Sequence, residues 1–384
     1  MKKILALVLA VAMVACMFVG CAGEPEETTP ATTTTPATTP DTTPDTTPDT
    51  APVTSGDAMK VAFVTDVGNT DDHSFNQYSY EGVTKFAEAN GLESTYYKPA
   101  GETNQDRIDS IQQAIDDGYG VIVMAGYLFG PAVYQVATAN PDVLFLALDV
   151  TTADLGSDTV PANIALICYQ EEQSGYLAGY AAVVEGYKEL GFLGGIDVPA
   201  VVRFGYGFVQ GAEQAAADLG VEGVNIKYWY SGSFVANDDI ATKMDAWYVE
   251  GTEVVFACGG GIYQSCLSAA KSNDGLMIGV DVDQSSVSDL IITSAEKALS
   301  NSVVLALTDA MNNGWAWPEA YAGTCQYLGA AQNCVGLPFA NSKFEVFTEQ
   351  QYNELYAKMA DGTLTVSNSI EEQPAVSHIT VDYQ

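Results

Sequence analysis

Acidic residues directly follow three apolar segments of the chain, at points where strands are expected to end. They are Asp66, Asp149 and Asp281. Carboxylates accept hydrogen bonds from hydroxyl and N–H groups, so three of them could hold a polar small molecule. Carboxylates can also act as general acid and base in the hydrolysis of a glycosidic bond. Ligand binding and hydrolysis are therefore the two kinds of chemistry open to these residues.

The segments around these residues alternate between predicted strands and predicted helices, a pattern typical of parallel sheets covered by helices. The rhythm begins again after about residue 162, which predicts two lobes. The predicted strands are 61–65, 121–125, 143–148, 191–194, 224–230, 254–257 and 276–280, and the clearest helices are 74–90, 105–117 and 203–219. Ligands bind at the carboxyl ends of strands in open α/β sheets, so two such lobes would place the three aspartates in a cleft between them.

The composition excludes several classes of function. The chain has 49 acidic and 14 basic residues, with a net charge of −35, so nucleic acid and anionic lipid are poor partners. It has only two histidines and none of the common hydrolase, zinc-peptidase or phosphate-loop motifs. We therefore expect no enzyme, no metal and no cofactor. A nucleosidase that uses the three aspartates stays open at this point, and product analysis would separate it from a binding protein.

The N-terminus has the form of a lipoprotein signal. Two lysines precede an apolar run at residues 4–20, which ends in a small residue directly before Cys21. This pattern predicts a signal peptide at residues 1–20, cleavage before Cys21, lipid attached to its sulfur and an extracytoplasmic location at the cell membrane. A second match at Cys16 is weaker because it shortens the apolar run. An uncleaved anchor is the alternative.

Residues 21–57 are predicted to form a tether. The stretch 22–57 contains 14 threonines, 7 prolines, seven acids and no base. Such a composition cannot bury a core and favours extended polyproline II, which could reach roughly 100 Å. The tether could let the folded part clear a cell wall, or it could be only a solubilising spacer.

Five cysteines lie beyond the leader and show no Cys-x-x-Cys spacing. Cys168 is expected to be a buried thiol because it falls in an apolar segment. Cys325 could pair with Cys334, and Cys258 with Cys266, and the odd number leaves at least one cysteine free.

An ordered set of segments resembles the basic membrane protein family, which comprises lipoprotein substrate-binding components of ABC transporters, several of which bind purine nucleosides. The resemblance covers about residues 60–312, and the stretches 315–334 and 259–263 depart from the usual pattern. The segments that carry the resemblance are 64–68 with 71–77, 175–180, Gly194-Gly195 with Phe204, Gly207-Phe208 and Gly211-Ala212, then 279–284 and 293–297.

The resemblance implies which residues contact a nucleoside. Phe75 and Phe234 would stack on the base, and Asp66, Asn76 and Asp149 would lie near its edge. Each has a structural alternative: Phe75 could be a core residue, Asn76 could cap the helix at 74–90, and the two aspartates could be strand-end caps. Three aromatic residues compete with Phe234, namely Phe204, Phe208 and Trp229.

The resemblance also implies contacts with the ribose. Asp281 would accept hydrogen bonds from two hydroxyls, Lys297 would donate to a third oxygen, and Gly260 would let the backbone approach the sugar. Lys297 could instead be a solvated lysine at a helix start. Asp283 and Gln284 are expected to be structural.

The resemblance and the strand–helix rhythm together predict an α/β protein with a type I periplasmic-binding-protein fold, in which two doubly wound parallel-sheet lobes are joined by a hinge. Lobe 1 would comprise 59–166 and about 292–325, and lobe 2 would comprise 167–291 and about 326–384. We expect a monomer that binds a nucleoside and delivers it to an ABC transporter permease. The alternatives are the same fold with a sugar or signalling molecule as ligand, and a surface adhesin or sensor.

Overall fold

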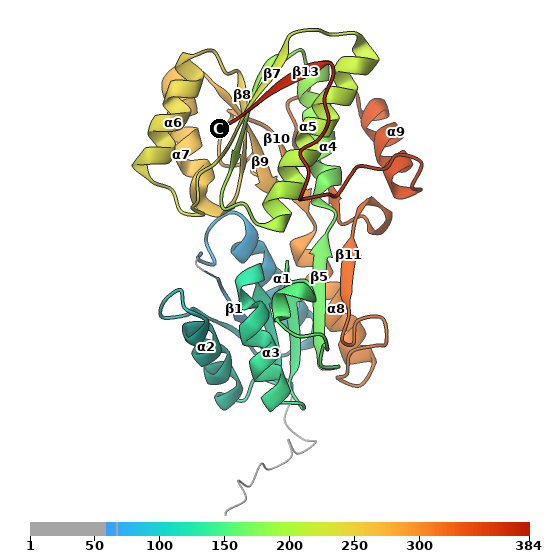
Figure 1. Ribbon diagram of the computed structural model, residues 1–384. Helices are drawn as coiled ribbons and strands as arrows, with labels where there is room; N and C mark the ends of the chain where they lie inside the picture. The colour runs from blue at the N-terminus through green and yellow to red at the C-terminus, as the bar shows by residue number, and fades with distance from the viewer. Residues whose placement is uncertain (1–58, 67) are drawn as a thin grey trace, which may run out of the picture. The chain divides into compact units, whose positions relative to one another are not determined.

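The computed structural model describes residues 59–66 and 68–384, which form two α/β lobes (Figure 1). The predicted signal, lipid site and tether, residues 1–57, lie outside the described residues. Within the described part of the chain, no helix is long and apolar enough to cross a membrane.

Lobe 1 contains a six-stranded parallel sheet in the order β11-β5-β4-β3-β1-β2. Its central strands are short and wholly apolar, which suits strands that are buried on both faces. The strands are β1 (Val61–Val64), β2 (Ser94–Tyr97), β3 (Val121–Ala125), β4 (Leu144–Leu148), β5 (Ile164–Tyr169) and β11 (Cys325–Leu328).

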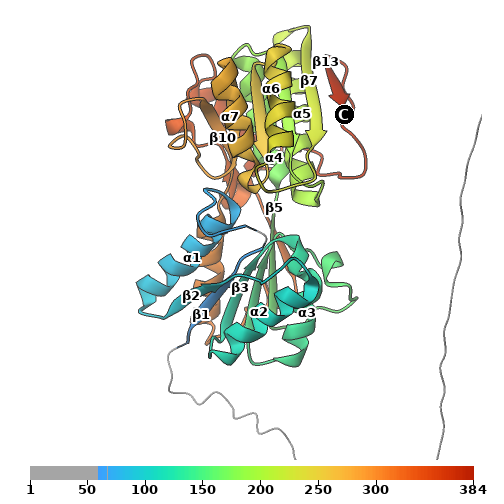
Figure 2. The same cartoon turned by 90° about the vertical axis from the view of Figure 1, so that its left-hand side faces the viewer.

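Two pairs of helices cover this sheet, one pair on each face (Figures 1 and 2). Alternate strand residues supply the two cores: Phe63 and Val123 pack with the first pair of helices, and Val64 and Met124 with the second. The first pair is α1 (Phe75–Asn90) and α8 (Leu299–Asn312), and the second is α2 (Asn104–Asp116) and α3 (Gly130–Ala139). The 3-10 turns η1 (Tyr127–Phe129) and η2 (Ala153–Leu155) adjoin α3.

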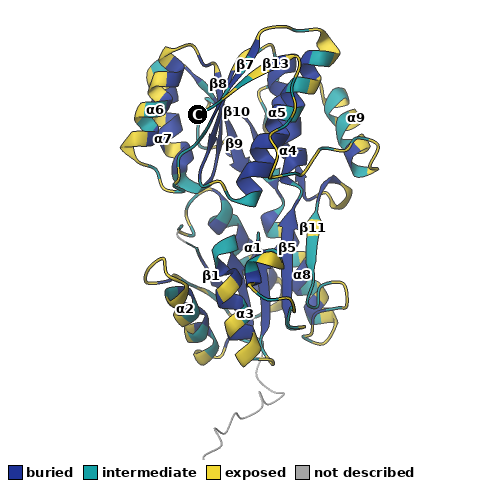
Figure 3. Ribbon diagram, viewed as in Figure 1, coloured by how far each residue is buried: buried dark blue, intermediate teal, exposed yellow. Residues whose placement is uncertain are grey.

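Lobe 2 contains a seven-stranded sheet in the order β12-β10-β9-β8-β6-β7-β13, which is parallel except for β12. Its strands are β6 (Glu189–Gly194), β7 (Val224–Tyr230), β8 (Val254–Cys258), β9 (Leu276–Asp281), β10 (Ile291–Lys297), β12 (Val335–Gly336) and β13 (Ile379–Tyr383). The helices are α4 (Glu171–Val184), α5 (Pro199–Leu219), α6 (Asp238–Val249), α7 (Tyr263–Asn273) and α9 (Glu349–Ala360), with turns η3 (Gly260–Ile262), η4 (Ala330–Gln332) and η5 (Phe339–Asn341). In both lobes the central strands are buried, whereas the edge strands β2, β11 and β13 and the outer helix surfaces are partly exposed (Figure 3).

Predicted and observed segments agree closely, and only two of the predicted element starts differ by two residues or more. β6 begins at Glu189, two residues before the predicted strand, because Glu189 pairs with Asn225 on β7. Helix α5 begins at Pro199 and not at Arg203. Proline suits the first position of a helix because its missing N–H would have no partner there. The four added residues place Arg203 one turn inside the helix.

The lobe boundaries differ from the predicted ones. β10 (Ile291–Lys297) belongs to the sheet of lobe 2, while β11 (Cys325–Leu328) belongs to that of lobe 1. The segment of lobe 1 that returns from lobe 2 therefore runs from α8 to β11 and does not begin at 292. The prediction failed because only pairing with a neighbouring strand assigns a strand to a sheet, and this pairing leaves no local mark in the segments of β10 and β11.

Helices α4 and α5 contact each other through their backbones, which explains why the segments that resemble the family contain glycines at these positions. A Cβ at Gly175 or Gly179 would lie 2.1 or 2.0 Å from the carbonyl oxygens of Phe204 and Phe208, and one at Gly211 would lie 2.0 Å from that of Tyr176. No larger residue fits such a contact, so the helices need glycine there. This close packing sets the first turn of α4 against the first turns of α5.

The five cysteines in the described residues are free thiols, so neither of the suggested disulfide pairs is present. Cys325 instead lies beside Cys168, because β11 pairs with β5 in the sheet of lobe 1. Cys168 is buried, as its apolar surroundings predicted.

Candidate functional site

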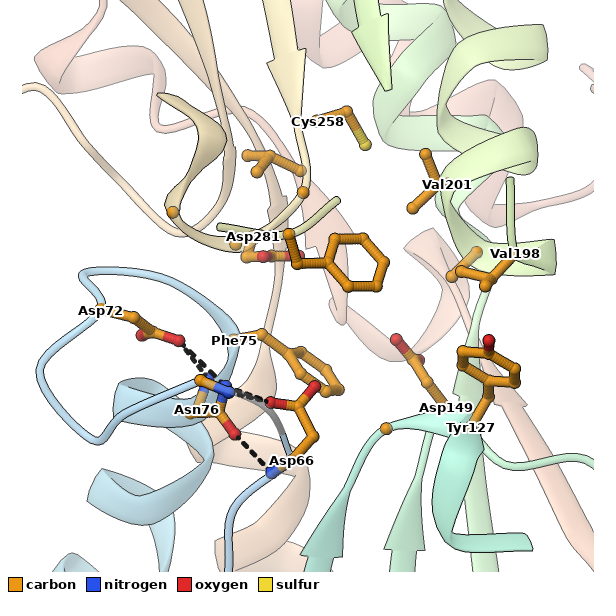
Figure 4. Close-up of a pocket in the computed structure, with 18 of the residues that line it drawn as sticks. Asp66, Asp72, Phe75, Asn76, Tyr127, Asp149, Val198, Val201, Cys258 and Asp281 are labelled. Carbon is orange, nitrogen blue, oxygen red and sulfur yellow. Dashed lines mark hydrogen bonds between the residues drawn. The ribbon is translucent and has the colours of Figure 1, made fainter. Parts of the chain in front are cut away.

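A cavity of about 690 Å³ lies between the lobes at the carboxyl ends of their strands (Figure 4). This volume suits a drug-sized small molecule. The cavity brings together all eight of the predicted contact residues, although they are spread over more than two hundred positions of the sequence. Lobe 1 contributes Asp66, Phe75, Asn76 and Asp149, and lobe 2 contributes Phe234, Gly260, Asp281 and Lys297.

Asn76 holds the carboxylate of Asp66 and does not cap helix α1. Its Nδ2 donates to Asp66 Oδ1 at 2.9 Å and to Asp72 Oδ2 at 3.1 Å, and its Oδ1 accepts from the Asp66 N–H at 3.2 Å. Gly68 N–H also donates to Asp66 Oδ1, at 2.8 Å. These contacts direct the carboxylate of Asp66 toward the cavity (Figure 4), and its Oδ2 has no hydrogen bond within the described residues.

Asp72 is a residue that the sequence reasoning missed. It accepts hydrogen bonds from the backbone N–H groups of Ser74, Asn76 and Gln77, the groups that a helix N-terminus leaves unpaired. The signal was present, because an aspartate just before a predicted helix start is a common N-terminal capping residue. Asp72 thus fixes the first turn of α1, from which Phe75 and Asn76 reach the cavity.

Asp149 and Asp281 follow β4 and end β9 respectively, and both have left-handed backbone conformations, with φ of 55° and 68°. This conformation is uncommon for residues other than glycine, and aspartate tolerates it better than most. It turns each chain sharply at the strand end and leaves the carboxylates at the cavity wall. Ser74 Oγ of lobe 1 donates to Asp281 Oδ2 at 2.6 Å, so this contact crosses the cleft.

Lys297 is buried, so it is not a solvated lysine. Its ammonium lies 2.5 Å from Asp149 Oδ2, 3.3 Å from Glu171 Oε1 and 3.9 Å from Asp281 Oδ1. It also lies 5.0 Å from the centre of the Phe75 ring, within the range of a cation–π contact. Lys297 is therefore the centre of a buried charge cluster that spans both lobes.

Glu171 and Arg203 complete this cluster and were not predicted. Glu171 is fully buried at the start of α4, and its Oε2 accepts from Arg203 Nε at 2.6 Å. Glu172 lies 4.0 Å from the same nitrogen. A signal for the two glutamates existed, since they follow the end of β5 as Asp66, Asp149 and Asp281 follow theirs. Only the close packing of α4 on α5 brings Arg203 to Glu171.

The cluster has more acids than bases, and burial raises the pKa values of Asp149, Glu172 and Asp281. Burial raises the pKa of Asp149 to about 6, against the opposing effect of Lys297. Burial together with the charge of Glu171 raises the pKa of Glu172 to about 7. For Lys297, burial acts to lower the pKa, but the charges of Asp149, Glu171 and Asp281 outweigh it and hold the pKa above its ordinary value. The lysine therefore stays charged, whereas Asp149 and Glu172 take up protons near neutral pH.

Phe234 is held in place by glycines. A Cβ added to Gly195 would lie 2.5 Å from ring atoms of Phe234, and one added to Gly259 would lie 2.9 Å from them. Gly260 has φ of 50°, and the N–H of Gly261 donates to the Phe234 carbonyl at 2.8 Å. The glycine-rich turn after β8 thus packs against the aromatic ring of Phe234 and holds the backbone of this residue in place. The sequence assigned Gly260 to a close backbone approach to the sugar and did not indicate that this turn supports Phe234.

No group of three or more histidine, cysteine, aspartate or glutamate residues is arranged to hold a metal ion in the part of the chain that the structure describes. The buried acids are instead matched with Lys297 and Arg203.

Two α/β lobes with a polar and aromatic cavity between them are the architecture of the periplasmic-binding type, whose members bind a small molecule between the lobes. The chain belongs to the family described as "ABC transporter substrate-binding protein PnrA-like", which matches residues 59–369. This confirms the resemblance to the basic membrane protein family. It also makes the chain a substrate-binding protein and not an enzyme, one that works outside the cytoplasm with a transporter permease.

Two curated relatives illustrate the match. The chain is 31% identical over 251 residues to basic membrane protein A1 of Borrelia garinii subsp. bavariensis. The aligned region covers 64% of this chain and 70% of the relative. It is 29% identical over 239 residues to the "ABC transporter nucleoside-binding protein BmpA" of Lactococcus lactis subsp. cremoris, which covers 59% of this chain and 64% of the relative.

Solved structures confirm the predicted fold. An ABC transporter solute-binding protein from Aeropyrum pernix K1 matches with a TM-score of 0.65 and 20% identity, over 80% of this chain and 87% of that one. One from Conexibacter woesei DSM 14684 matches with a TM-score of 0.64 and 22% identity, over 81% and 99%. At these identities the likeness concerns the fold alone.

Proposed function

We propose that this protein is a lipid-anchored receptor that binds a purine nucleoside in the interlobe cavity and delivers it to its ABC permease. The observation that carries the proposal is the combination of aromatic rings and unsatisfied acceptors in one cavity. Phe75 and Phe234 enter it from opposite lobes, and Asp149 Oδ1 is buried without a hydrogen-bond partner among the described residues. A buried acceptor without a partner is costly, and a ligand hydroxyl or N–H would satisfy it.

The division of polar groups fits the two parts of a nucleoside. Asp66, held by Asn76, offers Oδ2 to donors on a base edge. Asp281 Oδ2 accepts from Ser74, whereas Oδ1 has no hydrogen bond within the described residues and lies 3.9 Å from the Lys297 ammonium, so Oδ1 suits a ribose hydroxyl. Stacking on aromatic rings stabilises nucleic-acid bases by about 1–3 kcal/mol each. The printed name of the Lactococcus relative, a nucleoside-binding protein, supports the same ligand class.

Closure of the lobes around the ligand would be the state that the permease recognises. The contacts Ser74–Asp281 and Lys297–Asp149 both join the lobes beside the cavity. A ligand that bridges the same carboxylates would add to these contacts and favour closure.

Titration calorimetry tests the ligand class. Inosine, guanosine, adenosine and uridine are titrated into the folded domain, residues 58–384, with ribose and galactose as controls. Purine nucleosides are expected to bind, and pyrimidine nucleosides less tightly. Heat with a sugar and none with any nucleoside would replace the proposal with the sugar-binding alternative, and no heat with either would favour an adhesin or sensor.

The lipid anchor is tested separately in the full chain. Replacement of Cys21 by alanine is expected to release the protein from the membrane fraction, because the sulfur that carries the lipid is lost. Cys16→Ala is the matched control and should leave the protein with the membrane. Retention of the Cys21→Ala protein in the membrane would instead indicate an uncleaved anchor.

A further inference from the structure

Two thiols lie in contact where the strands of lobe 1 approach the hinge. Cys168 is on β5, one residue before the chain crosses to lobe 2, and Cys325 is on the neighbouring edge strand β11. Their sulfur atoms are 3.5 Å apart. Cys168 is buried and lines the ligand cavity, whereas Cys325 is half-buried. The pair therefore connects the cavity wall to the edge of the sheet.

Both thiols also contact the backbone next to a cavity carboxylate. The sulfur of Cys168 lies 3.4 Å from the carbonyl oxygen of Val150, and that of Cys325 lies 3.8 Å from it. Val150 is fully buried and directly follows Asp149, which has the left-handed backbone conformation. The S–H of Cys168 thus donates to the turn that presents Asp149 to Lys297, and the single S–H of Cys325 lies within reach of the same carbonyl and of the Cys168 sulfur.

We propose that Cys168 and Cys325 form a reversible disulfide with a small-molecule disulfide as oxidant, and that this bond weakens ligand binding through the Asp149–Val150 turn. Side-chain rotation must bring the sulfurs to the bond length of about 2.05 Å, which is a short approach from contact. Substrate-binding proteins work outside the cytoplasm, where oxidants that convert thiols to disulfides are available.

The reaction begins at the more accessible thiol. The hydrogen bond between the two thiols lowers the pKa of Cys325. The same hydrogen bond, together with burial, raises the pKa of Cys168. The Cys325 thiolate attacks one sulfur of the small disulfide, and one small thiol leaves with a proton. The Cys168 sulfur, on losing its proton, then attacks Cys325, and the second small thiol leaves with that proton. Two protein thiols are oxidised by two electrons, and one small disulfide is reduced to two thiols.

The bond would act on the site in two ways. It removes the S–H of Cys168, which donates to the buried carbonyl of Val150, and it moves the Cys168 side chain away from the cavity toward β11. Loss of a hydrogen bond to this buried acceptor weakens the turn that positions Asp149 at the cavity. We therefore expect affinity for the ligand to fall about tenfold. This second part rests on the proposed nucleoside function, whereas formation of the bond does not.

The first arm of the test measures the bond itself. The reduced domain is incubated with bis(2-hydroxyethyl) disulfide, the remaining thiols are alkylated, and peptides are mapped by mass spectrometry. The expected result is a Cys168–Cys325 cross-linked peptide that dithiothreitol removes. Cys325→Ser should abolish it, and Cys334→Ser, which removes a thiol that has no sulfur neighbour in the described residues, should retain it. Full alkylation of both cysteines in the wild-type protein after oxidation would overturn the proposal, whether or not any variant folds.

The second arm compares inosine binding by the oxidised and reduced wild-type protein. A tenfold weaker affinity after oxidation, restored by dithiothreitol and absent in Cys325→Ser, supports the coupling. Equal affinities in the two forms, with the cross-link present, would overturn it. A protein that forms the cross-link but binds no nucleoside in either form supports the disulfide and refutes the proposed ligand, so the two failures are distinguishable.

Discussion

The ammonium of Lys297, at the end of a strand in lobe 2, lies 2.5 Å from the carboxylate of Asp149, which follows a strand in lobe 1. Both side chains are largely buried, with exposures of 3% and 12%. The pair therefore contributes to the ligand cavity and to the contact between the lobes at once.

Replacement of Lys297 by methionine should destabilise the fold and abolish ligand binding. The change leaves Asp149, Glu171 and Asp281 buried without their shared cation, which typically costs about 3–5 kcal/mol of the free energy of unfolding. Denaturant unfolding measures the loss. Lys343→Met is the control, because Lys343 pairs with the fully exposed Asp289 and should change stability by less than about 1 kcal/mol. Similar losses in the two variants would contradict the role of the cluster.

Stability should fall as the pH rises from mildly acidic to mildly alkaline values. Burial raises the pKa of Glu172 to about 7 from an ordinary 4.5, and that of Asp149 to about 6 from 3.8. Between the unfolded and folded pKa values the folded state binds more protons than the unfolded state. The contribution of Glu172 and Asp149 to the free energy of unfolding is therefore present below about pH 4 and is lost by about pH 7. For Glu172 this amounts to roughly 3 kcal/mol.

Denaturant unfolding of the wild-type protein and of Glu172→Gln at about pH 5 and about pH 8 measures this dependence. Glutamine keeps the shape of the protonated acid, so the variant should be more stable than the wild type at the higher pH and lose part of the slope. An unchanged slope in the variant would show that Glu172 does not titrate in this range.

A neutral nucleoside should bind far more tightly than the matching nucleotide. Six aspartates and three basic residues line the cavity, and two of the bases, Arg203 and Lys297, are already paired with buried carboxylates. A phosphate about 4 Å from an unpaired carboxylate is disfavoured by ~4 kcal/mol, or roughly a thousandfold in affinity. Calorimetry with guanosine and guanosine 5′-monophosphate tests this directly, and comparable affinities would contradict the charge argument.

Loss of the Phe234 ring should weaken nucleoside binding by roughly ten- to a hundredfold, since stacking on one base contributes about 1–3 kcal/mol. Gly195→Ala should weaken it as well, because the new methyl group would lie 2.5 Å from the ring and displace it. Phe344→Ala, which removes an aromatic residue outside the cavity lining, is the control. If Phe234→Ala binds the nucleoside with wild-type affinity, Phe234 does not contact the ligand.

Asp281→Ala should abolish nucleoside binding, because the ribose hydroxyls lose their acceptor and the contact with Ser74 is lost. Asp283→Ala is a matched control two residues away, where the carboxylate accepts from Asn341 and not from the cavity. Calorimetry on both variants should separate them by at least two orders of magnitude in affinity. Equal binding by the two variants would show that Asp281 is not a ligand contact.

The apolar segments and the glycines at helix contacts determined the fold from the sequence alone. Strands that are buried on both faces must be apolar throughout, so the segment 121–125 was identified residue by residue. Asp66, Asp149 and Asp281 were also evident, because a carboxylate after such a segment must lie at the ligand edge of the sheet.

Only the tertiary structure decided which of these groups meet and what holds them. The sequence did not indicate that β10 belongs to the sheet of lobe 2 and β11 to that of lobe 1. It also did not indicate that Cys325 contacts Cys168, or that Glu171 and Arg203 lie beside Lys297 in one buried cluster. The physical reason is the same in each case. Helical period, strand alternation and capping are local and leave a trace along the chain, whereas strand pairing and buried ion pairs join residues far apart, and their energies depend on distances that exist only in the folded protein.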